Sequence, residues 1–277
     1  LMLATDPDAD RVGIAVKDNN GAYHLLSGNE VGVLLLDYIA TGRTENGTMP
    51  RNPVMVKSIV STPMADEVAK AHKVDAINVL TGFKYIGEQI LKLEQEGEEN
   101  RFIFGFEESY GYLAGTYVRD KDAVVASMLI CEMAAYHNSK GSSLYEALQA
   151  LYTEYGYYLN KVDSFEFEGL AGMAKMAGMM DTLRQNHPAE LAGYPVLAIS
   201  DYEALTLTTP STGVVAKIDL PPSNIIMYGL AGGASIIVRP SGTEPKLKVY
   251  YATKGKNAAE AAAEQQALSN AIKPLLV

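Results

Sequence analysis

Three aspartates at two-residue spacing, Asp6, Asp8 and Asp10, form the most chemically distinctive stretch of the sequence, and Arg11 follows them directly. Three like charges this close repel one another, so the pattern predicts a cation among them. Carboxylate oxygens suit a hard cation, and Mg²⁺ favours a few of them together with phosphate or water oxygens. A calcium EF-hand is excluded, because its sixth position must be Gly and is Arg11, and its twelfth must be Glu and is Lys17. A solvated acidic turn is the alternative.

The stretch "RPSGTEPKLKVYY" (239–251) combines the groups that hold a phosphate: a guanidinium fork, short hydroxyls, accessible backbone N–H groups and a lysine. These candidate ligands are Arg239, Ser241, Gly242, Thr243 and Lys246. The pattern differs from a Walker loop, which is Gly-rich and ends in Gly-Lys-Ser/Thr before a helix. A simple turn between two strands is the alternative.

The stretch "GFEESYGYL" (105–113) predicts a polar loop between two strands, with Glu107, Glu108 and Ser109 on it. Carboxylates and a hydroxyl on a loop suit sugar hydroxyls, which they bind by charge-assisted hydrogen bonds. Arg119 and Lys121 follow shortly, next to acidic residues. The alternative for this region is a surface ion-pair network.

A further candidate is "TGFKYIG" (81–87), where a predicted strand turns into a helix. Thr81 and Gly82 would expose backbone N–H groups at the N-terminus of that helix, which is a natural site for an anion. The alternative is an ordinary capped start of a helix.

The elements that must position these residues fall into two patterns. From about 29 to 150, predicted strands and helices alternate, which indicates an α/β layer with a mainly parallel sheet. An Asn-Gly hairpin precedes this region, within 11–26. Near 155–162 the pattern changes to a helix and then several strands in succession, which is typical of an α+β domain with an antiparallel sheet. The methionines of 173–180 are predicted to fill its core; an adaptable binding surface is the alternative.

Composition excludes several classes of protein. No apolar run is long enough to span a bilayer. The net charge of −10 and the pI near 4.9 argue against a general nucleic-acid binder. Cys131 lies in an apolar helical context and is predicted to be a buried thiol, which fits a reducing cytoplasm.

Taken together and in this order, the motifs resemble those of the α-D-phosphohexomutase family, which includes phosphoglucomutases and phosphomannomutases. The resemblance implies that the aspartate loop binds Mg²⁺ through Asp6, Asp8 and Asp10, and that Arg11 and Lys121 take part in catalysis. It also implies that the loop around Glu107 holds the sugar hydroxyls and that the Arg-x-Ser-Gly-Thr loop binds the unreactive phosphate. The substrate-binding residues implied are Thr81, Gly82, Lys84, Glu107, Ser109, Arg119, Arg239, Ser241, Gly242, Thr243 and Lys246.

The family is built of four domains, and the resemblance assigns parts of three of them to this chain. It implies the tail of domain 2 at 1–27, domain 3 at 28–158 and domain 4 at 159–277. Domain 3 would be α/β, and domain 4 a smaller α+β unit resembling the TATA-binding-protein fold. The nucleophilic serine of the family belongs to a Thr-Ala-Ser-His-Asn-Pro-like segment of domain 1, and no histidine of this chain follows a serine. We therefore expect a C-terminal portion of a longer enzyme that is inactive alone.

For the whole enzyme, the resemblance implies a phosphoserine that transfers its phosphoryl group to a hexose monophosphate and takes back the other phosphate of the 1,6-bisphosphate. Mg²⁺ and Arg11 would neutralise the transferring group. Lys121 would act as an acid and base, with its pKa lowered by its neighbours. The expected partners are hexose phosphates and hexose 1,6-bisphosphate, without nucleic acid or membrane. Self-association through exposed apolar surface and a cytoplasmic location are further expectations.

Several related activities stay open. The aromatic Tyr110 in "GFEESYGY" favours the phosphoglucomutase branch, because the phosphomannomutase and phosphoglucosamine branches usually show Gly-His there. The alternatives are phosphomannomutase, phosphopentomutase, glucose-1,6-bisphosphate synthase, phosphoglucosamine mutase, or a non-catalytic module that binds sugar phosphates.

Overall fold

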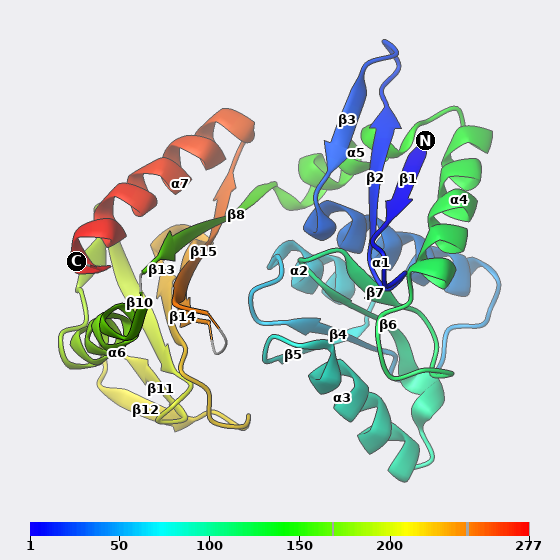
Figure 1. Cartoon of the computed structure of the whole chain (residues 1–277). Coiled ribbons are helices and arrows are strands. Elements are labelled where there is room, and N and C mark those ends of the chain that lie inside the picture. The colour runs from blue at the N-terminus through cyan, green and yellow to red at the C-terminus, as the bar shows by residue number, and fades with distance from the viewer. Residues whose placement is uncertain (168, 242–243, 277) are drawn as a thin grey trace. The chain divides into compact units, whose positions relative to one another are not determined.

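The computed structural model describes residues 1–167, 169–241 and 244–276 of the chain. They form two compact units, Leu1–Tyr155 and Gly156–Val277 (Figure 1). The division therefore falls slightly before the expected end of domain 3 at 158. The segment expected to be the tail of domain 2 packs as part of the first unit.

The first unit combines an antiparallel sheet of order β1-β2-β3 with a second sheet of order β5-β4-β6-β7. In the second sheet β4 is parallel to β5 and β6, and only β7 is antiparallel to its neighbour. This arrangement confirms the α/β class with a mainly parallel sheet. The strands are β1 (Met2–Thr5), β2 (Val12–Lys17), β3 (Tyr23–Leu26), β4 (Val54–Ser58), β5 (Asp75–Val79), β6 (Phe102–Glu107) and β7 (Gly111–Leu113). The helices are α1 (Gly28–Glu45), α2 (Met64–Ala71), α3 (Phe83–Gln95), η1 (Glu99–Arg101), α4 (Ala123–Ser139) and α5 (Leu144–Tyr155).

Helices cover both faces of the mainly parallel sheet (Figure 1). Successive residues of β6 point to opposite faces, as in any strand. A Cβ on Gly32 of α1 would lie 2.4 Å from the Phe106 ring, and a Cβ on Gly105 would lie 2.8 Å from Ile86 of α3. The two helices therefore pack so closely on opposite faces of β6 that glycine is required at both contacts.

Local sequence signals account for several boundaries. The β2–β3 hairpin is confirmed, and its turn has Gly21 in the left-handed region at φ +85°. Helix α1 begins with a capping box, in which Ser27 and Glu30 each accept a backbone N–H of the other. Helix α2 begins directly after Pro63, and the Thr62 hydroxyl accepts the backbone N–H of Met64.

The predicted strand after the polar loop is present but short, since β7 ends at Leu113. The prediction for Cys131 is wrong. The thiol of Cys131 is exposed, because α4 is apolar around most of its circumference but buries only one side. Val124 and Met128, at helical spacing from Cys131, are also exposed, at 70% and 58%.

The second unit is built on one antiparallel sheet of order β12-β11-β10-β13-β14-β15-β8, with β9 paired to β10. The strands are β8 (Tyr157–Glu166), β9 (Glu190–Leu191), β10 (Tyr194–Asp201), β11 (Thr206–Thr209), β12 (Val214–Lys217), β13 (Ile226–Leu230), β14 (Ser235–Pro240) and β15 (Lys246–Gly255). The helices are α6 (Gly169–Gln185), η2 (Ala231–Gly233), α7 (Ala258–Ile272) and η3 (Lys273–Leu276). Strand β8 fills the region that the sequence suggested as a boundary.

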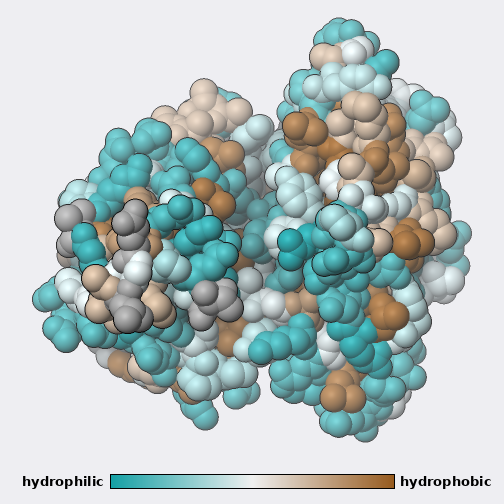
Figure 2. All heavy atoms as spheres, in the orientation of Figure 1, coloured by the Kyte–Doolittle hydropathy of each residue, from teal (hydrophilic) through white to brown (hydrophobic). Residues whose placement is uncertain are grey.

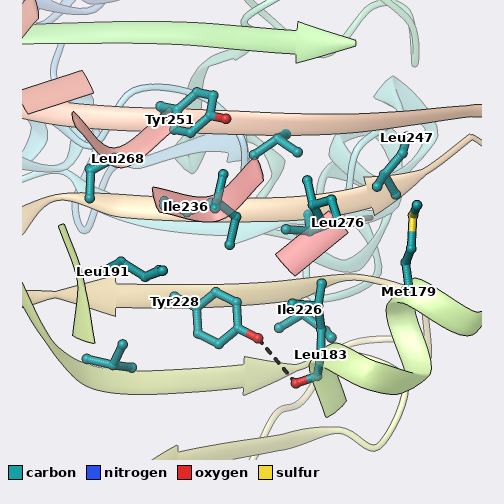
Figure 3. Close-up of a cluster of buried hydrophobic side chains, with 14 of the residues drawn as sticks. Met179, Leu183, Leu191, Ile226, Tyr228, Ile236, Leu247, Tyr251, Leu268 and Leu276 are labelled. Atoms are coloured by element: carbon teal, nitrogen blue, oxygen red, sulfur yellow. Dashed lines mark hydrogen bonds between the residues drawn. The ribbon is translucent and has the colours of Figure 1, made fainter. Parts of the chain in front are cut away.

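Alternate residues of the central strands point to the same face and pack against α6 and α7 (Figure 3). Tyr228 and Ile236 are fully buried in this core, and the Tyr228 hydroxyl donates to the Leu183 carbonyl of α6 at 3.3 Å. Met176, Met179 and Met180 are also buried there, as predicted for the methionines of 173–180. For Met173 the prediction is wrong, since it is 49% exposed. The likeness to the TATA-binding-protein fold stays a prediction.

Apolar side chains are exposed on the first antiparallel sheet, at Leu1, Met2, Leu3, Tyr23 and Leu25. Figure 2 shows hydrophobic surface over the upper part of this unit, below the tip of the hairpin. Self-association through such surface stays a prediction. Within the described ranges, no helix combines the length and the hydropathy needed to span a bilayer.

Candidate active site

Motifs that are far apart in the sequence meet at one edge of the first unit, where the parallel strands have their carboxyl ends. The Lys121 ammonium lies 2.7 Å from Oδ2 of Asp10 and 5.9 Å from the centre of the Phe83 ring. Glu107, the last residue of β6, accepts the backbone N–H of Gly82 at 2.6 Å. This edge is where open α/β sheets bind their ligands.

The aspartate loop is shaped by its own backbone. Oδ1 of Asp6 accepts the backbone N–H groups of Asp10 and Arg11, both at 3.2 Å. Ala9, which directly precedes Asp10, adopts a left-handed conformation at φ +54°. The Ala9 carbonyl accepts the N–H of Ala123, which ties the loop to the start of α4. Partial burial raises the pKa of Asp6, but the two backbone N–H groups outweigh it and hold the pKa below its usual value. Asp6 is therefore ionised at neutral pH.

The carboxylates suit Mg²⁺ by donor chemistry, since it prefers hard oxygen ligands. Their present positions do not gather around one point: Asp6 faces backbone N–H groups, Asp8 is exposed in the turn, and Asp10 faces Lys121. In the ranges that the structure describes, no three His, Cys, Asp or Glu side chains stand together as a metal-holding group. The Lys121 ammonium places a positive charge beside Asp10, and a cation shared by all three aspartates stays a prediction.

The expectation of a lowered pKa for Lys121 is wrong for this structure. Burial of the ammonium lowers its pKa, but hydrogen bonds to Asp10 and Asp120 raise it above the ordinary value. The Asp120 oxygen lies 3.2 Å from the ammonium. A Cβ on Gly111 would lie 2.7 Å from the Lys121 side chain, so this glycine leaves the space through which the lysine reaches Asp10.

The Glu107 side chain also departs from the prediction. It lies at the end of a strand instead of on the loop, and only 5% of it is exposed. Burial raises the pKa of Glu107, while the Gly82 N–H and the charges of Lys121 and Arg11 oppose that rise. The carboxylate is thus a nearly enclosed acceptor that is already bound to the turn carrying Thr81.

The remaining predicted residues of the first unit are less enclosed. The Thr81 hydroxyl oxygen is buried and has no hydrogen-bond partner among the described residues, whereas most buried polar atoms have one. Ser109 is half-buried in the turn after β6. Lys84 is exposed and lies over the Tyr85 ring, 4.8 Å from its centre. Arg119 points away to Glu94, with 2.6 Å between the charged groups.

Sequence reasoning missed the groups that anchor the turn 108–110. The Ser58 hydroxyl, fully buried at the end of β4, donates to the Glu108 carboxylate at 3.2 Å and lies 2.8 Å from the Ser61 hydroxyl. The turn also packs on α1, because a Cβ on Gly28 would lie 2.1 Å from the Glu108 carbonyl oxygen. The available signal was a serine at the end of a buried strand, Ser58, with a second serine three residues later.

The phosphate-loop candidate lies in the second unit. Arg239 stands on β14 opposite Lys248 of β15. The Ser241 N–H donates to the Lys246 carbonyl at 2.7 Å, which closes the turn. Gly242 and Thr243 lie outside the described residues. The Lys246 ammonium pairs with Glu244 and Glu166, both at 3.2 Å, and these hydrogen bonds raise its pKa.

A cavity of about 410 Å³ lies beside the phosphate-loop candidate. Arg239, Ser241 and Asn224 contribute polar groups to its lining, and Met173 and Met176 of α6 contribute an apolar wall. Lys246 is not among the residues that line it. The predicted ligands Arg239 and Ser241 therefore share one cavity, and Lys246 forms ion pairs elsewhere.

Known proteins resemble the chain over most of its length. The family model described as phosphoglucomutase/phosphomannomutase, alpha/beta/alpha domain III, matches residues 27–155, and the model for the C-terminal domain of the same family matches 216–269. The chain is 40% identical to the phosphoglucomutase of Staphylococcus haemolyticus and 42% identical to that of Staphylococcus epidermidis, each over 250 residues. These matches cover 90% of this chain and 44% of each relative, so the chain spans less than half the length of the curated relatives that it matches.

Two solved structures share the fold. Pp63/parafusin from Paramecium, described as a phosphoglucomutase in its open form, superimposes with a TM-score of 0.66 at 20% identity, over 99% of this chain and 44% of that one. N-acetylphosphoglucosamine mutase of Aspergillus fumigatus, in complex with GlcNAc-6P and magnesium, gives a TM-score of 0.53 at 15% identity, over 99% of this chain and 49% of that one.

Proposed function

Because the chain belongs to the phosphoglucomutase/phosphomannomutase family, we propose that it carries the sugar-binding and distal-phosphate sites of an enzyme that interconverts hexose 1-phosphate and hexose 6-phosphate. The observation that carries the proposal is the convergence of Asp10, Gly82, Glu107 and Lys121 at one edge of the first unit. Such a convergence of charged and polar groups is what a polar, anionic sugar ligand requires.

Each half of the proposed ligand has its own groups. Glu107 and Ser109 would accept and donate hydrogen bonds at the sugar hydroxyls, with the Thr81 hydroxyl as a further partner. Arg239 and Ser241, with Gly242 and Thr243 of the same motif, would hold the phosphate that does not react.

The metal and the transfer of the phosphoryl group belong to the same proposal. Mg²⁺, bound by Asp6, Asp8 and Asp10, would supply positive charge to the transferring group. Arg11 would add its charge at the same group, and Lys121 would hold or deliver a proton. The 277 residues contain no counterpart of the phosphoserine segment, so we propose that the chain by itself binds the ligand without turning it over through a 1,6-bisphosphate.

Glucose phosphates are the proposed substrates, because the curated relatives compared above are phosphoglucomutases. The first experiment is a calorimetric titration of the chain with glucose 1-phosphate, glucose 6-phosphate, mannose 6-phosphate and ribose 5-phosphate, each with excess Mg²⁺. We expect saturable binding of the glucose phosphates, and the ranking separates phosphoglucomutase from phosphomannomutase and phosphopentomutase.

A matched pair of variants tests the site. Arg239→Ala removes the proposed phosphate fork and should abolish binding. Lys217→Ala removes one positive charge from an exposed position on β12 of the same unit and should leave affinity unchanged. Absence of binding by folded wild-type protein, or equal affinity of the Arg239→Ala variant, would contradict the proposal.

A further inference from the structure

The cavity beside Arg239 has a second polar wall that neither the sequence motifs nor the family models assign. Asn224, which precedes β13, lines it together with Arg239 and Ser241. The segment around Asn224 is held in place, since the Ser223 N–H donates to the Tyr202 carbonyl at 3.0 Å. The Asn224 side chain is thus carried on a fixed backbone next to the proposed phosphate site.

The orientation of the Asn224 amide follows from its partner. Nη2 of Arg184 lies 2.6 Å from Oδ1 of Asn224. A guanidinium carries only donors, so the amide atom that faces it must be the oxygen. The –NH₂ group of Asn224 then points away from Arg184, and no acceptor for it occurs within 1–167, 169–241 or 244–276. Asn224 is exposed, so its two N–H donors are open to water or to a ligand in the cavity that this residue lines.

Arg184 is itself held firmly. Its Nε lies 3.2 Å from Oδ2 of Asp201, and its Nη2 lies 2.6 Å from Oε2 of Glu203. Only 17% of the Arg184 side chain is exposed. These pairings fix the plane of the guanidinium, which in turn fixes the amide. Its single positive charge offsets only part of the negative charge of the carboxylates around it.

We propose that Asn224 donates a hydrogen bond to a phosphoryl oxygen in this cavity and that Arg184 is the positioning residue that holds its amide in the donating orientation. The proposal rests on the proposed function, which places the unreactive phosphate of a hexose phosphate beside Arg239. Met176 gives the cavity a buried apolar side, whereas Met173 beside it is 49% exposed.

Asn224→Asp is the sharpest test. The substitution keeps the size of the side chain and lets a carboxylate pair with Arg184, so the melting temperature should not fall. It removes both N–H donors and places a negative charge in the cavity. We expect the affinity of the 277-residue chain for inorganic phosphate and for glucose 1-phosphate, measured by calorimetry, to fall by more than about tenfold, and that of Asn224→Ala by about tenfold. Asn270→Asp adds the same charge at an exposed position of α7, and this variant should bind phosphate like wild type.

A double-mutant cycle tests the role of Arg184. Arg184→Met should weaken phosphate binding more in the wild-type background than in the Asn224→Ala background, because the part of its effect that acts through the amide is absent there. Equal losses in both backgrounds would overturn the positioning role.

The outcomes separate this proposal from the one on which it rests. If wild type binds and Arg239→Ala does not, but Asn224→Asp binds as tightly as wild type, Asn224 is not a ligand and the inference alone fails. If folded wild type binds neither inorganic phosphate nor glucose 1-phosphate, the proposed function fails and the inference falls with it.

Discussion

At the scale of the residue, the Glu107 carboxylate interacts both with the Gly82 turn and with nearby positive charges. Its carboxylate satisfies the N–H of Gly82 at 2.6 Å, which fixes the turn that carries Thr81, and it remains close enough to Lys121 and Arg11 for their charges to act on its pKa. A sugar hydroxyl would form a stronger hydrogen bond with this buried carboxylate than with a neutral acceptor, because the bond is charge-assisted.

Glu107→Gln removes the negative charge of the side chain and keeps its size, so it tests the contribution of the charge alone. The amide oxygen can still accept the Gly82 N–H, so the fold should persist, while affinity for glucose 1-phosphate should fall by about tenfold in a calorimetric titration. Glu107→Ala leaves the Gly82 N–H unpaired and should also lower the free energy of unfolding by about 1–3 kcal/mol. Glu99→Gln, at an exposed position, is the control. Unchanged affinity of Glu107→Gln would exclude the carboxylate from sugar binding.

His137, in the last turn of α4, gives the first unit a dependence on pH. Burial lowers the pKa of His137 below its model-peptide value of 6.5, the charge of Lys140 adds to this, and Asp37 opposes it. The unfolded chain then binds a proton more readily than the folded one, so the stability that the neutral ring contributes is present above pH 6.5 and is lost as pH falls through the folded pKa.

An NMR titration of the His137 ring should give a pKa below 6.5, and the urea midpoint of the first unit should drop less between pH 7.5 and 5.5 in His137→Gln than in wild type. A ring that titrates at or above 6.5 would show that burial does not control it.

At the scale of the element, the start of α1 and the turn 108–110 are fitted to each other. Gly28→Ala would place a Cβ 2.1 Å from the Glu108 carbonyl oxygen, so the backbone must shift. We expect a loss of about 1–3 kcal/mol in the free energy of unfolding, together with weaker binding of hexose phosphates. Gly42→Ala on the same helix meets nothing within 4 Å and should stabilise the chain by about 0.5–1 kcal/mol. Urea unfolding of the two variants checks this, and a neutral Gly28→Ala would contradict the close fit.

Elements with a local signal could be predicted from the sequence. The Asn-Gly hairpin, the capped start of α1 and the Asp122 cap of α4, which accepts the N–H groups of Val124 and Val125, depend on neighbours within a few residues. The motifs of the candidate site could also be found, because each consists of adjacent residues.

The failures depend on partners that are distant in the sequence. The pattern of α4 is apolar on several sides, so it could not show that Cys131 faces outward. The sequence also could not show that Glu107 ends a buried strand, or that the Lys121 ammonium faces two carboxylates instead of cations. Burial and charge pairing of this kind arise only when the loops meet at the edge of the sheet.

At the scale of the whole molecule, each unit has its own core, which predicts that each unfolds as a separate cooperative transition. Two tyrosines of like chemistry test this. The Tyr112 hydroxyl donates to the Gly28 carbonyl in the first unit, and the Tyr228 hydroxyl to the Leu183 carbonyl in the second, both at 3.3 Å.

Tyr112→Phe and Tyr228→Phe should each lower the stability of one unit by about 0.5–1.5 kcal/mol and leave the other transition in place. Differential scanning calorimetry of the wild type and both variants measures this. A single transition that moves with either substitution would show that the units unfold together.

The exposed thiol of Cys131 has a practical consequence. The sequence holds one cysteine, and it lies on the outer side of α4 in the first unit, so a maleimide dye attaches at a single known place without any substitution. A second cysteine introduced on exposed α7 would allow a donor and an acceptor fluorophore to be placed on different units. Energy transfer between them would then report, molecule by molecule, whether adding a hexose phosphate changes the distance between the two units.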